Sequence, residues 1–211
     1  TQYTRDEMDR VNDINQTASG VQNKNVGCEY YANGWLKKEM LPNGYSNNYV
    51  YDGAGRMTEL NRLDANGVST LKYNYTYDNN GNRTGIVETG NSGAQIVSAY
   101  EYDKINRLVK EVNGHSGNTI AYKFDARNNI TEKTVSGVDN YTESYIYTSE
   151  HTDKYMSDRI IEVTKKSEDT VVGRTYYYQE PNGNTYQKIE TNEYGEPAEI
   201  DRKSTRLNSS H

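Results

Sequence analysis

One short pattern recurs along this chain and constrains its fold more than any other feature. The pattern is Tyr-x-Tyr-Asp-x-x-Gly/Asn-Arg/Asn, followed by an apolar residue. Fixed periods of roughly 20 to 50 residues are the signature of repeat architectures, so the repeat takes precedence over local predictions of secondary structure. The clearest copies contain Tyr49, Tyr51, Asp52, Gly55 and Arg56; Tyr75, Tyr77, Asp78 and Gly81; Tyr100, Tyr102, Asp103, Asn106 and Arg107; and, less regularly, Tyr122, Phe124 and Asp125.

Weaker copies start at Tyr3 and Cys28, and a further one starts at Tyr145. The second aromatic slot then falls at positions 5, 30, 51, 77, 102, 124 and 147, so the intervals are 25, 21, 26, 25, 22 and 23. Chance does not produce so many matches in order. The sequence therefore predicts a tandem array of about seven repeats.

Each copy has the chemistry of a β-hairpin. Residues two apart on a strand share a face, so Tyr49 and Tyr51 are expected to form an aromatic pair on one side. Asp52 can accept a hydrogen bond from the backbone two residues further on, and Gly55 tolerates the left-handed conformation that ends the turn. A return strand is expected to follow, and a second turn, such as Asn66-Gly67, Asn113-Gly114 or Ser136-Gly137, closes the unit.

The composition agrees with a thin, all-β structure. Only 33% of the residues are apolar, but 21 are tyrosines and one is phenylalanine, whereas disordered chains are poor in aromatics. Tyrosine suits sheets that are partly wet on both faces. Because one hairpin cannot bury its aromatic face alone, stacked neighbours must supply the core. The expected fold is an extended, curved antiparallel sheet of tandem hairpins.

These residues and their spacing resemble the YD-repeat (Rhs-repeat) family of bacterial polymorphic toxins and wall-associated proteins, which is related to insecticidal toxin-complex subunits and to teneurins. The resemblance covers roughly residues 3–147. It implies β-hairpins wound into a hollow spiral shell that often encloses a toxic C-terminal domain. It also places such an effector after the repeats, where this sequence contains none that we recognise.

The organisation of the chain follows from where the pattern is clear. We expect a YD-repeat array over residues 1–148 and diverged repeats with an insertion over residues 149–200. The insertion is the polar stretch between Ser149 and Ser157, and the diverged copies lie near Tyr176 and Asn192. Residues 201–211 read like a translated sequencing adapter, so we expect them to be an artefact.

Several classes of function are disfavoured by the bulk properties. Net charge is -6, and the lysines and arginines are dispersed among acidic residues, which argues against nucleic acid. No apolar stretch has the length of a membrane span, and the N-terminus lacks the features of a signal peptide. We expect no membrane insertion by this segment. The secretion signal of a longer parent would lie elsewhere.

The residues that could carry chemistry are better explained as structure. His115 and His151 lie in predicted loops and His211 in the suspect tail, without ligand spacing. Cys28 takes a slot that is aromatic in the other copies, and the adjacent Glu29 opposes a reactive thiolate. The repeated aspartates recur once per unit, which fits turn closers better than a catalytic or calcium site. We therefore predict no enzyme, no metal and no cofactor.

The leading hypothesis is a non-catalytic structural segment of a secreted or cell-surface bacterial toxin of the Rhs type. Its partners would be neighbouring repeats and a C-terminal effector of the same polypeptide. The alternative is a carbohydrate-binding adhesin, because aromatic surfaces flanked by Asn, Asp and Arg also bind sugars. Replacing outward-facing tyrosines would separate the two hypotheses.

Overall fold

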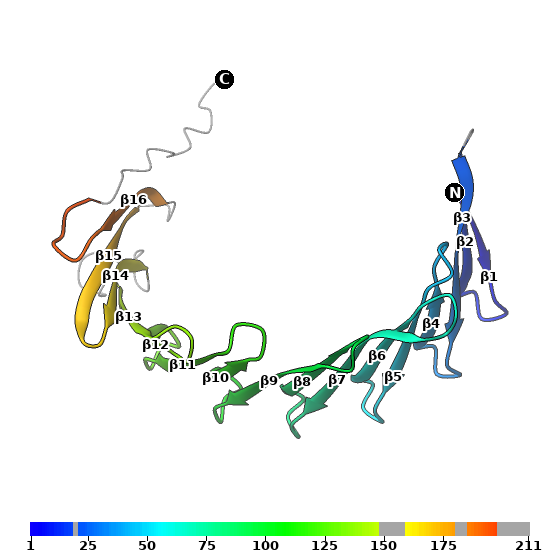
Figure 1. The fold of residues 1–211 in the computed structure, drawn as a ribbon, viewed down its shortest axis with the longest axis horizontal. Coiled ribbons are helices and arrows are strands. Elements are labelled where there is room, and N and C mark those ends of the chain that lie inside the picture. Colours follow the sequence, from blue (N-terminus) through cyan, green and yellow to red (C-terminus); the bar gives the residue numbers. More distant parts are fainter. Residues whose placement is uncertain (19–20, 148–158, 180–184, 198–211) are drawn as a thin grey trace. The chain divides into compact units, whose positions relative to one another are not determined.

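A computed structural model describes residues 1–18, 21–147, 159–179 and 185–197, and all regular structure in this part of the chain is β-structure. No described residue lies in a helix that could cross a membrane. The strands are β1 (Gln2–Arg5), β2 (Val11–Ala18), β3 (Val21–Tyr30), β4 (Leu36–Met40), β5 (Ser46–Tyr51), β6 (Met57–Leu63), β7 (Ser69–Tyr77), β8 (Arg83–Gly90), β9 (Gln95–Tyr102), β10 (Leu108–Asn113), β11 (Asn118–Phe124), β12 (Ile130–Ser136), β13 (Tyr141–Tyr147), β14 (Ile160–Ser167), β15 (Thr170–Gln179) and β16 (Thr185–Thr191) (Figure 1).

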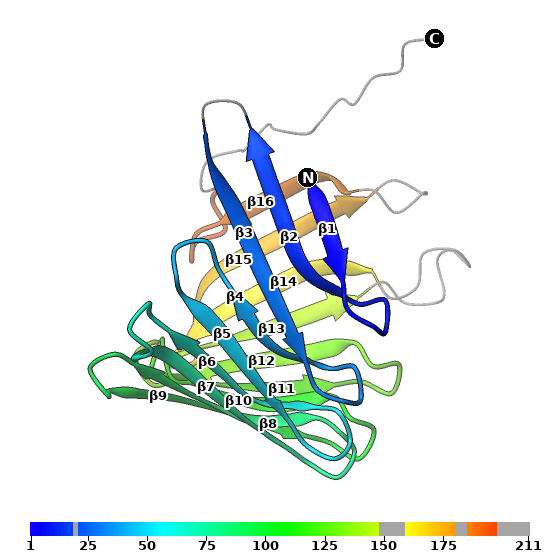
Figure 2. The ribbon, with the colours of Figure 1, turned by 90° about the vertical axis from the view of Figure 1, so that its right-hand side faces the viewer.

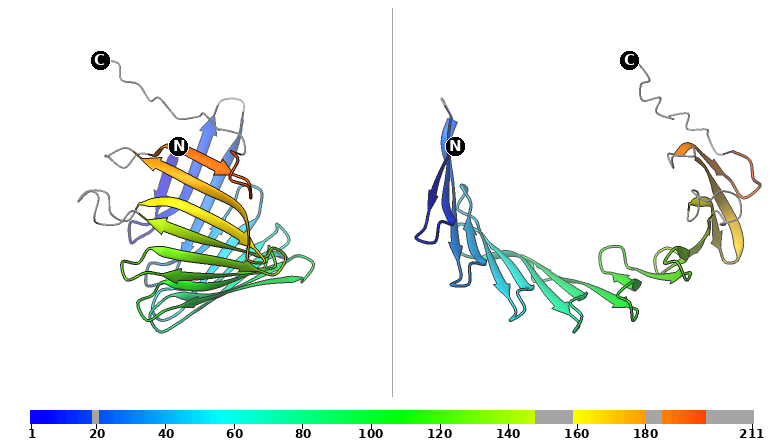
Figure 3. Two further views of the ribbon diagram at one scale, coloured as in Figure 1. Left: turned by 90° about the vertical axis from the view of Figure 1, so that its left-hand side faces the viewer. Right: turned by 180° about the vertical axis from the view of Figure 1, so that it is seen from behind.

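The chain divides into two compact units, Thr1–Tyr100 and Glu101–His211. In the first unit, consecutive strands from β1 to β9 are neighbours in the sheet, and the pairs with described registers are antiparallel (Figure 2). In the second unit, β10 to β16 follow the same rule (Figure 3). The prediction of an all-β array of tandem antiparallel hairpins is confirmed.

The sheet of the first unit has two different faces. Directly opposed residues of paired strands point to the same side, so the register sorts the side chains. Tyr49, Leu60 and Tyr73 are successive partners across β5, β6 and β7. The opposite side carries polar rows, such as Asn48, Asn61, Lys72, Thr89 and Gln95. We call these sides the tyrosine face and the polar face.

The second unit repeats this division. Its tyrosine face contains Tyr122, Val135 and Tyr145, and its polar face contains the opposed pair Thr134 and Thr142. The alternation follows from the two-residue period of a strand, which places one residue type on each side.

The core of both units is thin. Val135, at 3% exposure, is the one buried hydrophobic residue among those described, and no described side chain is completely enclosed. Most tyrosine rings are half-buried by neighbours within their own sheet. Stability must therefore come from contacts between adjacent hairpins, as expected for a repeat array.

The predicted boundaries at residues 148, 200 and 211 cannot be compared with the structure, because residues 148–158 and 198–211 lie outside the described ranges. The predicted insertion and His151 also lie outside them. The described residues on either side of the predicted insertion continue the hairpin pattern, because β13 pairs with β14 through Tyr145 and Val163.

Candidate functional site: the turn ladder

The repeated motif forms one type of five-residue turn. The backbone N–H of the first residue donates to the carbonyl of the fifth, and the N–H of the fourth donates to the carbonyl of the first. In the motif copies these turns start at Asp6, Tyr31, Asp52, Asp78, Asp103 and Asp125; others start at Leu41, Asp64, Gly90 and Asn192. The same turn type thus occurs at both ends of the strands; the sequence predicted a second turn at Asn66-Gly67, but not that it shares this geometry.

The fourth position of the turn adopts a left-handed backbone. Its φ is 84° at Gly55, 90° at Gly81, 64° at Asn106 and 72° at Asn128. Glycine has no Cβ to clash in this region, and asparagine is the residue that tolerates it next best. The glycine or asparagine of the motif is therefore explained by backbone geometry.

The aspartate at the first position closes the turn with both carboxylate oxygens. Asp52 Oδ1 accepts the backbone N–H of Ala54 at 2.9 Å and that of Arg56 at 3.0 Å, while Oδ2 accepts Nε of Arg56 at 2.7 Å. Asp103 and Arg107 repeat this arrangement, with Nε to Oδ2 at 2.6 Å. The carboxylate is therefore fully engaged by its own turn.

Asparagine replaces arginine at the fifth position of two turns. Asn82 Nδ2 donates to Asp78 Oδ2 at 2.9 Å, and Asn129 Nδ2 donates to Asp125 Oδ2 at 3.0 Å. The shorter side chain closes the turn locally in the same way. Arginine, being longer, has further donors available for a neighbour.

These hydrogen bonds hold the pKa of the turn aspartates below the usual range. For Asp52 the main cause is the backbone N–H of Arg56, followed by its guanidinium. For Asp78 the main cause is the side-chain bond from Asn82. At Asp125, desolvation is the largest single effect and raises the pKa, but the hydrogen bonds together outweigh it. The turns are thus built for the charged form of aspartate.

The arginine also reaches the following repeat. Arg56 Nη1 donates to the carbonyl of Asp78 at 2.9 Å, and the guanidinium carbon lies 4.8 Å from the centroid of the Tyr77 ring. The Tyr77 hydroxyl donates back to the carbonyl of Met57 at 2.7 Å. Stacking on a ring face and forked donation are both typical of arginine. We call this reciprocal contact the repeat clamp.

One other turn shows the same clamp, and another shows its arginine half. Arg10 lies 4.7 Å from the ring centroid of Tyr30, whose hydroxyl donates to the carbonyl of Val11 at 2.6 Å. Arg107 lies 4.4 Å from the Phe124 ring centroid and donates to Asn128 Oδ1 at 2.8 Å. The sequence pattern showed that the arginine recurs, but it did not reveal this link to the next repeat. The joint recurrence of Arg and the next Tyr-Asp or Phe-Asp step could have indicated it.

Trp35 occupies the arginine position of the second copy. Its ring lies 5.2 Å from that of Tyr51, the second tyrosine of the next repeat, and Tyr31 meets Tyr51 edge-on at 6.2 Å. A Cβ added at Gly55 would lie 2.8 Å from Trp35 Cζ2. An aromatic cluster therefore takes the place of the clamp at this step, and it packs against the next turn.

The tyrosine face also carries a charged network in the second unit. Tyr145 donates to Glu143 at 2.9 Å, and Lys133 Nζ lies 3.2 Å from the same carboxylate. Burial is the main cause that raises the pKa of Tyr145, and the bond to Glu143 adds to it. Lys165 Nζ lies 3.8 Å from the Tyr141 ring centroid. These groups satisfy one another within the sheet.

The remaining candidates are the Cys28 thiol and the three histidines. Burial raises the pKa of the Cys28 thiol, with Glu39 adding to the effect, so the reactive thiolate is disfavoured. His115 lies in the turn between β10 and β11, and His151 and His211 are outside the described residues. The described residues contain no group of His, Cys, Asp and Glu suited to a metal ion.

No protein-family model and no curated protein matches this sequence. Solved structures do share its fold. A crystal structure of TcdB2-TccC3-Cdc42 is 16% identical with a TM-score of 0.61, over 91% of this chain and 12% of that chain. A crystal structure of TcdB2-TccC3 is 16% identical with a TM-score of 0.62, over 90% and 12%.

The Tc holotoxin pore of Photorhabdus luminescens gives the same result, with 16% identity and a TM-score of 0.61 over 91% of this chain and 12% of that chain. This chain thus corresponds to a small part of much longer proteins. The expected resemblance to toxin-complex relatives of YD-repeat proteins is confirmed at the level of fold, and over most of its length this chain has the fold of a segment of the Tc toxin-complex proteins.

Proposed function

We propose that this chain is a non-catalytic wall segment of a shell in a secreted or cell-surface bacterial toxin, where it helps to enclose or present a C-terminal effector. The observation that carries the proposal is the repeat clamp. Arg56 bonds its own Asp52 and the next turn at Asp78, so the most elaborate polar chemistry of the motif joins one hairpin to the next. Residues that link adjacent hairpins in this way have a structural role, which is what a shell wall requires.

The regular use of the aspartates supports a structural role. A catalytic site needs one asymmetric group of residues. Here the same carboxylate contacts recur at Asp6, Asp52 and Asp103, each with an arginine four residues later. Each carboxylate is already committed to its own turn. The partners of the segment would accordingly be the adjacent repeats and the effector, not a small-molecule substrate.

The likeness to toxin-complex structures supports the same proposal. Those chains are far longer than this one, and the match covers 12% of each, so a segment of this kind would be one part of a larger structure. A shell wall of this type also needs no metal, cofactor or nucleic acid.

The parent protein provides the test. Its full open reading frame is expected to encode a secretion signal and a domain after the repeats. In limited proteolysis of the purified parent, that domain should be cleaved more slowly than the same domain expressed alone. A parent without a downstream domain, or one whose domain is cleaved at the rate of the isolated form, would contradict the shell proposal.

Glycan binding by exposed tyrosines is the second candidate function. Tyr194 is 80% exposed and Tyr3 is 60% exposed, which leaves their rings open to a sugar. The test is to replace Tyr194 and Tyr3 by alanine and to measure binding on a glycan array. Loss of binding with unchanged unfolding would support the adhesin, and binding that is absent or follows stability would remove it.

A further inference from the structure

Several of the five-residue turns contain an asparagine directly before the left-handed glycine. These Asn-Gly steps occupy the third and fourth positions of their turns and are Asn33-Gly34, Asn43-Gly44, Asn66-Gly67 and Asn80-Gly81. The glycines have φ angles of 92°, 81°, 80° and 90°, in the same order, which is a region that suits a residue without Cβ. Asn113-Gly114 lies in a turn of another type, and Asn182-Gly183 lies outside the described residues.

An Asn-Gly step can lose ammonia without an enzyme. The glycine nitrogen gives its proton to hydroxide and attacks the asparagine Cγ, and the side-chain nitrogen takes a proton from water and leaves as ammonia, which closes a succinimide ring. Water then opens the ring to aspartate or to isoaspartate, in which the chain runs through the former side chain. Glycine favours the attack because it has no Cβ that crowds its nitrogen.

The fold restrains all four steps through the glycine nitrogen. In each turn this N–H donates to the carbonyl of the first residue, at 2.9 Å for Gly34, 3.0 Å for Gly44 and Gly67, and 3.2 Å for Gly81. A nitrogen that donates in this way must leave its partner before it can attack Cγ. Reaction in the folded chain therefore requires local opening of the turn, and the contacts that oppose opening set the rate.

Two of the asparagines use their own amide to close the turn. Asn33 Oδ1 accepts the backbone N–H of Trp35, and Asn43 Oδ1 accepts that of Tyr45, both at 3.2 Å. The carbonyl that would be attacked is thus already engaged. Trp35 and Tyr45 are also half-buried, so their rings anchor these turns to the sheet. Reaction at Asn33 or Asn43 must break an additional hydrogen bond.

The repeat clamp holds a third step, Asn80-Gly81. Its turn starts at Asp78, whose carbonyl also accepts Arg56 Nη1 at 2.9 Å. Asn82 closes the same turn through its 2.9 Å bond to Asp78 Oδ2. Opening this turn must loosen the contact with the preceding repeat.

The fourth step lies in the turn that starts at Asp64. Asp64 Oδ1 accepts the N–H groups of Asn66 and Val68, both at 2.9 Å, so this turn closes without the Asn66 amide. Val68 takes the position of Trp35 and Tyr45 but is 60% exposed, so it gives no comparable anchor. We propose that Asn66-Gly67 is the preferred site of spontaneous deamidation among these turns, with water as the co-reactant.

The two products should affect the turn differently. Isoaspartate at position 66 inserts a methylene group into the backbone before Gly67, which displaces the Gly67 N–H from the Asp64 carbonyl. The hairpin of β6 and β7 should then loosen. Aspartate keeps the length of the backbone and should leave the hairpin intact. This modification does not depend on the shell function.

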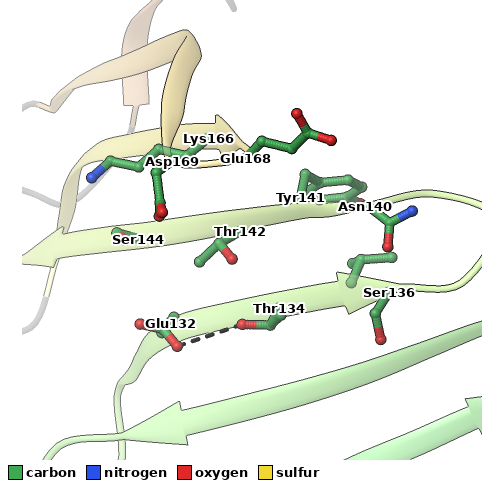
Figure 4. A pocket seen from close by; sticks show the side chains of 11 residues that line it. Glu132, Thr134, Ser136, Asn140, Tyr141, Thr142, Ser144, Lys166, Glu168 and Asp169 are labelled. Atoms are coloured by element: carbon green, nitrogen blue, oxygen red, sulfur yellow. Dashed lines mark hydrogen bonds between the residues drawn. The ribbon is translucent and has the colours of Figure 1, made fainter.

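Asn140 shows that exposure alone does not define such a site. It is exposed at the rim of a hollow of about 510 Å³ on the polar face of the second unit (Figure 4). Its Nδ2 donates to the Gly137 carbonyl at 3.2 Å, and its Oδ1 accepts the Gly137 N–H at 3.3 Å. The next residue is Tyr141, whose Cβ crowds the nitrogen that would attack. Asn140 therefore serves as an exposed reference that should stay intact.

The test is peptide mapping by mass spectrometry of the full chain during incubation in mildly alkaline buffer, with fragmentation that distinguishes aspartate from isoaspartate. Asn66 should react about two- to tenfold faster than Asn33 and Asn43, the factor for one net hydrogen bond, and faster than Asn80. In urea the four rates should converge. Equal rates in the folded chain, a difference that persists in urea, or an intact Asn66 while the chain in urea reacts would overturn the proposal.

Two variants test the cause, with the other Asn-Gly steps as internal controls. Leu41→Asp gives its turn the carboxylate found at Asp64, which releases the Asn43 amide and should accelerate reaction at Asn43 alone. Arg56→Ala removes the clamp and should accelerate reaction at Asn80 alone, and it provides the second measurement if Leu41→Asp does not fold. Unchanged rates at Asn43 and Asn80 in these variants would overturn the assignment to these contacts.

Discussion

Arg56 and Tyr77 hold consecutive repeats together from both sides. The guanidinium carbon lies 4.8 Å from the ring centroid, while the Tyr77 hydroxyl donates at 2.7 Å to the carbonyl of Met57, the residue after Arg56. Arg56 also contributes to its own turn through Asp52. Arg56 therefore links the closure of its own turn to the position of β7, the strand that contains Tyr77. Because the core is thin, such couplings should decide how cooperatively the array unfolds.

The first prediction concerns this coupling. Arg56→Ala removes the stacking on Tyr77 and the bond to Asp78, so it should lower the free energy of unfolding by about 1 to 2 kcal/mol. Arg56→Lys should retain only part of this free energy of unfolding, because lysine lacks the planar guanidinium whose N–H groups bond Asp52 and Asp78 at the same time. Urea unfolding followed by circular dichroism gives the measurement.

Lys123→Ala is the control for the arginine variants. Lys123 forms an ion pair with Glu132 at 2.7 Å, but its side chain is 71% exposed, so the change should cost less than about 0.5 kcal/mol. Equal effects of Arg56→Ala and Lys123→Ala would show that the repeat clamp adds nothing beyond a surface ion pair.

The second prediction tests the turn backbone at Gly55. Alanine there must adopt φ near +84°, and its Cβ would lie 2.8 Å from Trp35 Cζ2. Gly55→Ala should therefore cost at least about 1 to 2 kcal/mol. Gly53→Ala should be close to neutral, because Gly53 has no positive φ and nothing lies within 4 Å of an added Cβ. Measured unfolding free energies that agree for the two variants would contradict this account.

The third prediction uses the natural variation of the clamp. Phe124 stacks under Arg107 but has no hydroxyl, whereas the equivalent Tyr77 and Tyr147 donate to the carbonyls of Met57 and Ile130. Phe124→Tyr should gain the corresponding bond to the Leu108 carbonyl and stabilise the chain by about 0.5 to 1 kcal/mol.

Tyr77→Phe is the matched reverse change and should destabilise by a similar amount, since it leaves the Met57 carbonyl without this donor. Thermal melts of both single variants test the pair. Destabilisation by Phe124→Tyr would mean that the space beside Leu108 cannot accept a hydroxyl.

The turns could be predicted from the sequence because their chemistry is local. In the clearest copies an aspartate accepts a hydrogen bond from the backbone N–H two residues later, and a glycine or asparagine follows three residues after the aspartate, as in Asp52 and Gly55. This local pattern specifies the turn without knowledge of the rest of the fold. The second turn at Asn113-Gly114 lies where it was predicted, between β10 and β11, but the sequence did not show that Gly117 takes the positive φ there. Because this loop contains both Gly114 and Gly117, the register of the flanking strands decides which glycine adopts the positive φ.

The clamp depends on register between strands, which no local pattern contains. Arg107 meets Phe124 only because β10 and β11 pair at one offset, and Thr134 meets Thr142 only because β12 and β13 do. A shift of one residue would send each side chain to the other face of the sheet. The periodicity predicted that hairpins repeat, but not which residues face each other across them.

The fourth prediction concerns acid. The folded-state pKa of Asp52 is lowered mainly by the backbone N–H of Arg56, and that of Asp78 mainly by the side chain of Asn82. The unfolded value is about 3.9, so the unfolded chain binds more protons in acid. The contribution of these groups to stability is therefore fully present above about pH 4 and is lost as the pH falls through the folded-state values.

Asp52→Asn separates charge from turn geometry. Asn192 shows that an amide oxygen can close the same turn, since its Oδ1 accepts the N–H groups of Tyr194 and Glu196, both at 3.0 Å. Asp52→Asn should thus fold but unfold at lower urea than the unchanged chain at pH 7, and this difference should shrink between pH 4 and pH 2. Glu101→Gln, at a carboxylate that is 64% exposed, is the control and should change the urea midpoint little at any pH. A difference for Asp52→Asn that stays constant with pH would mean that the turn does not depend on the carboxylate charge.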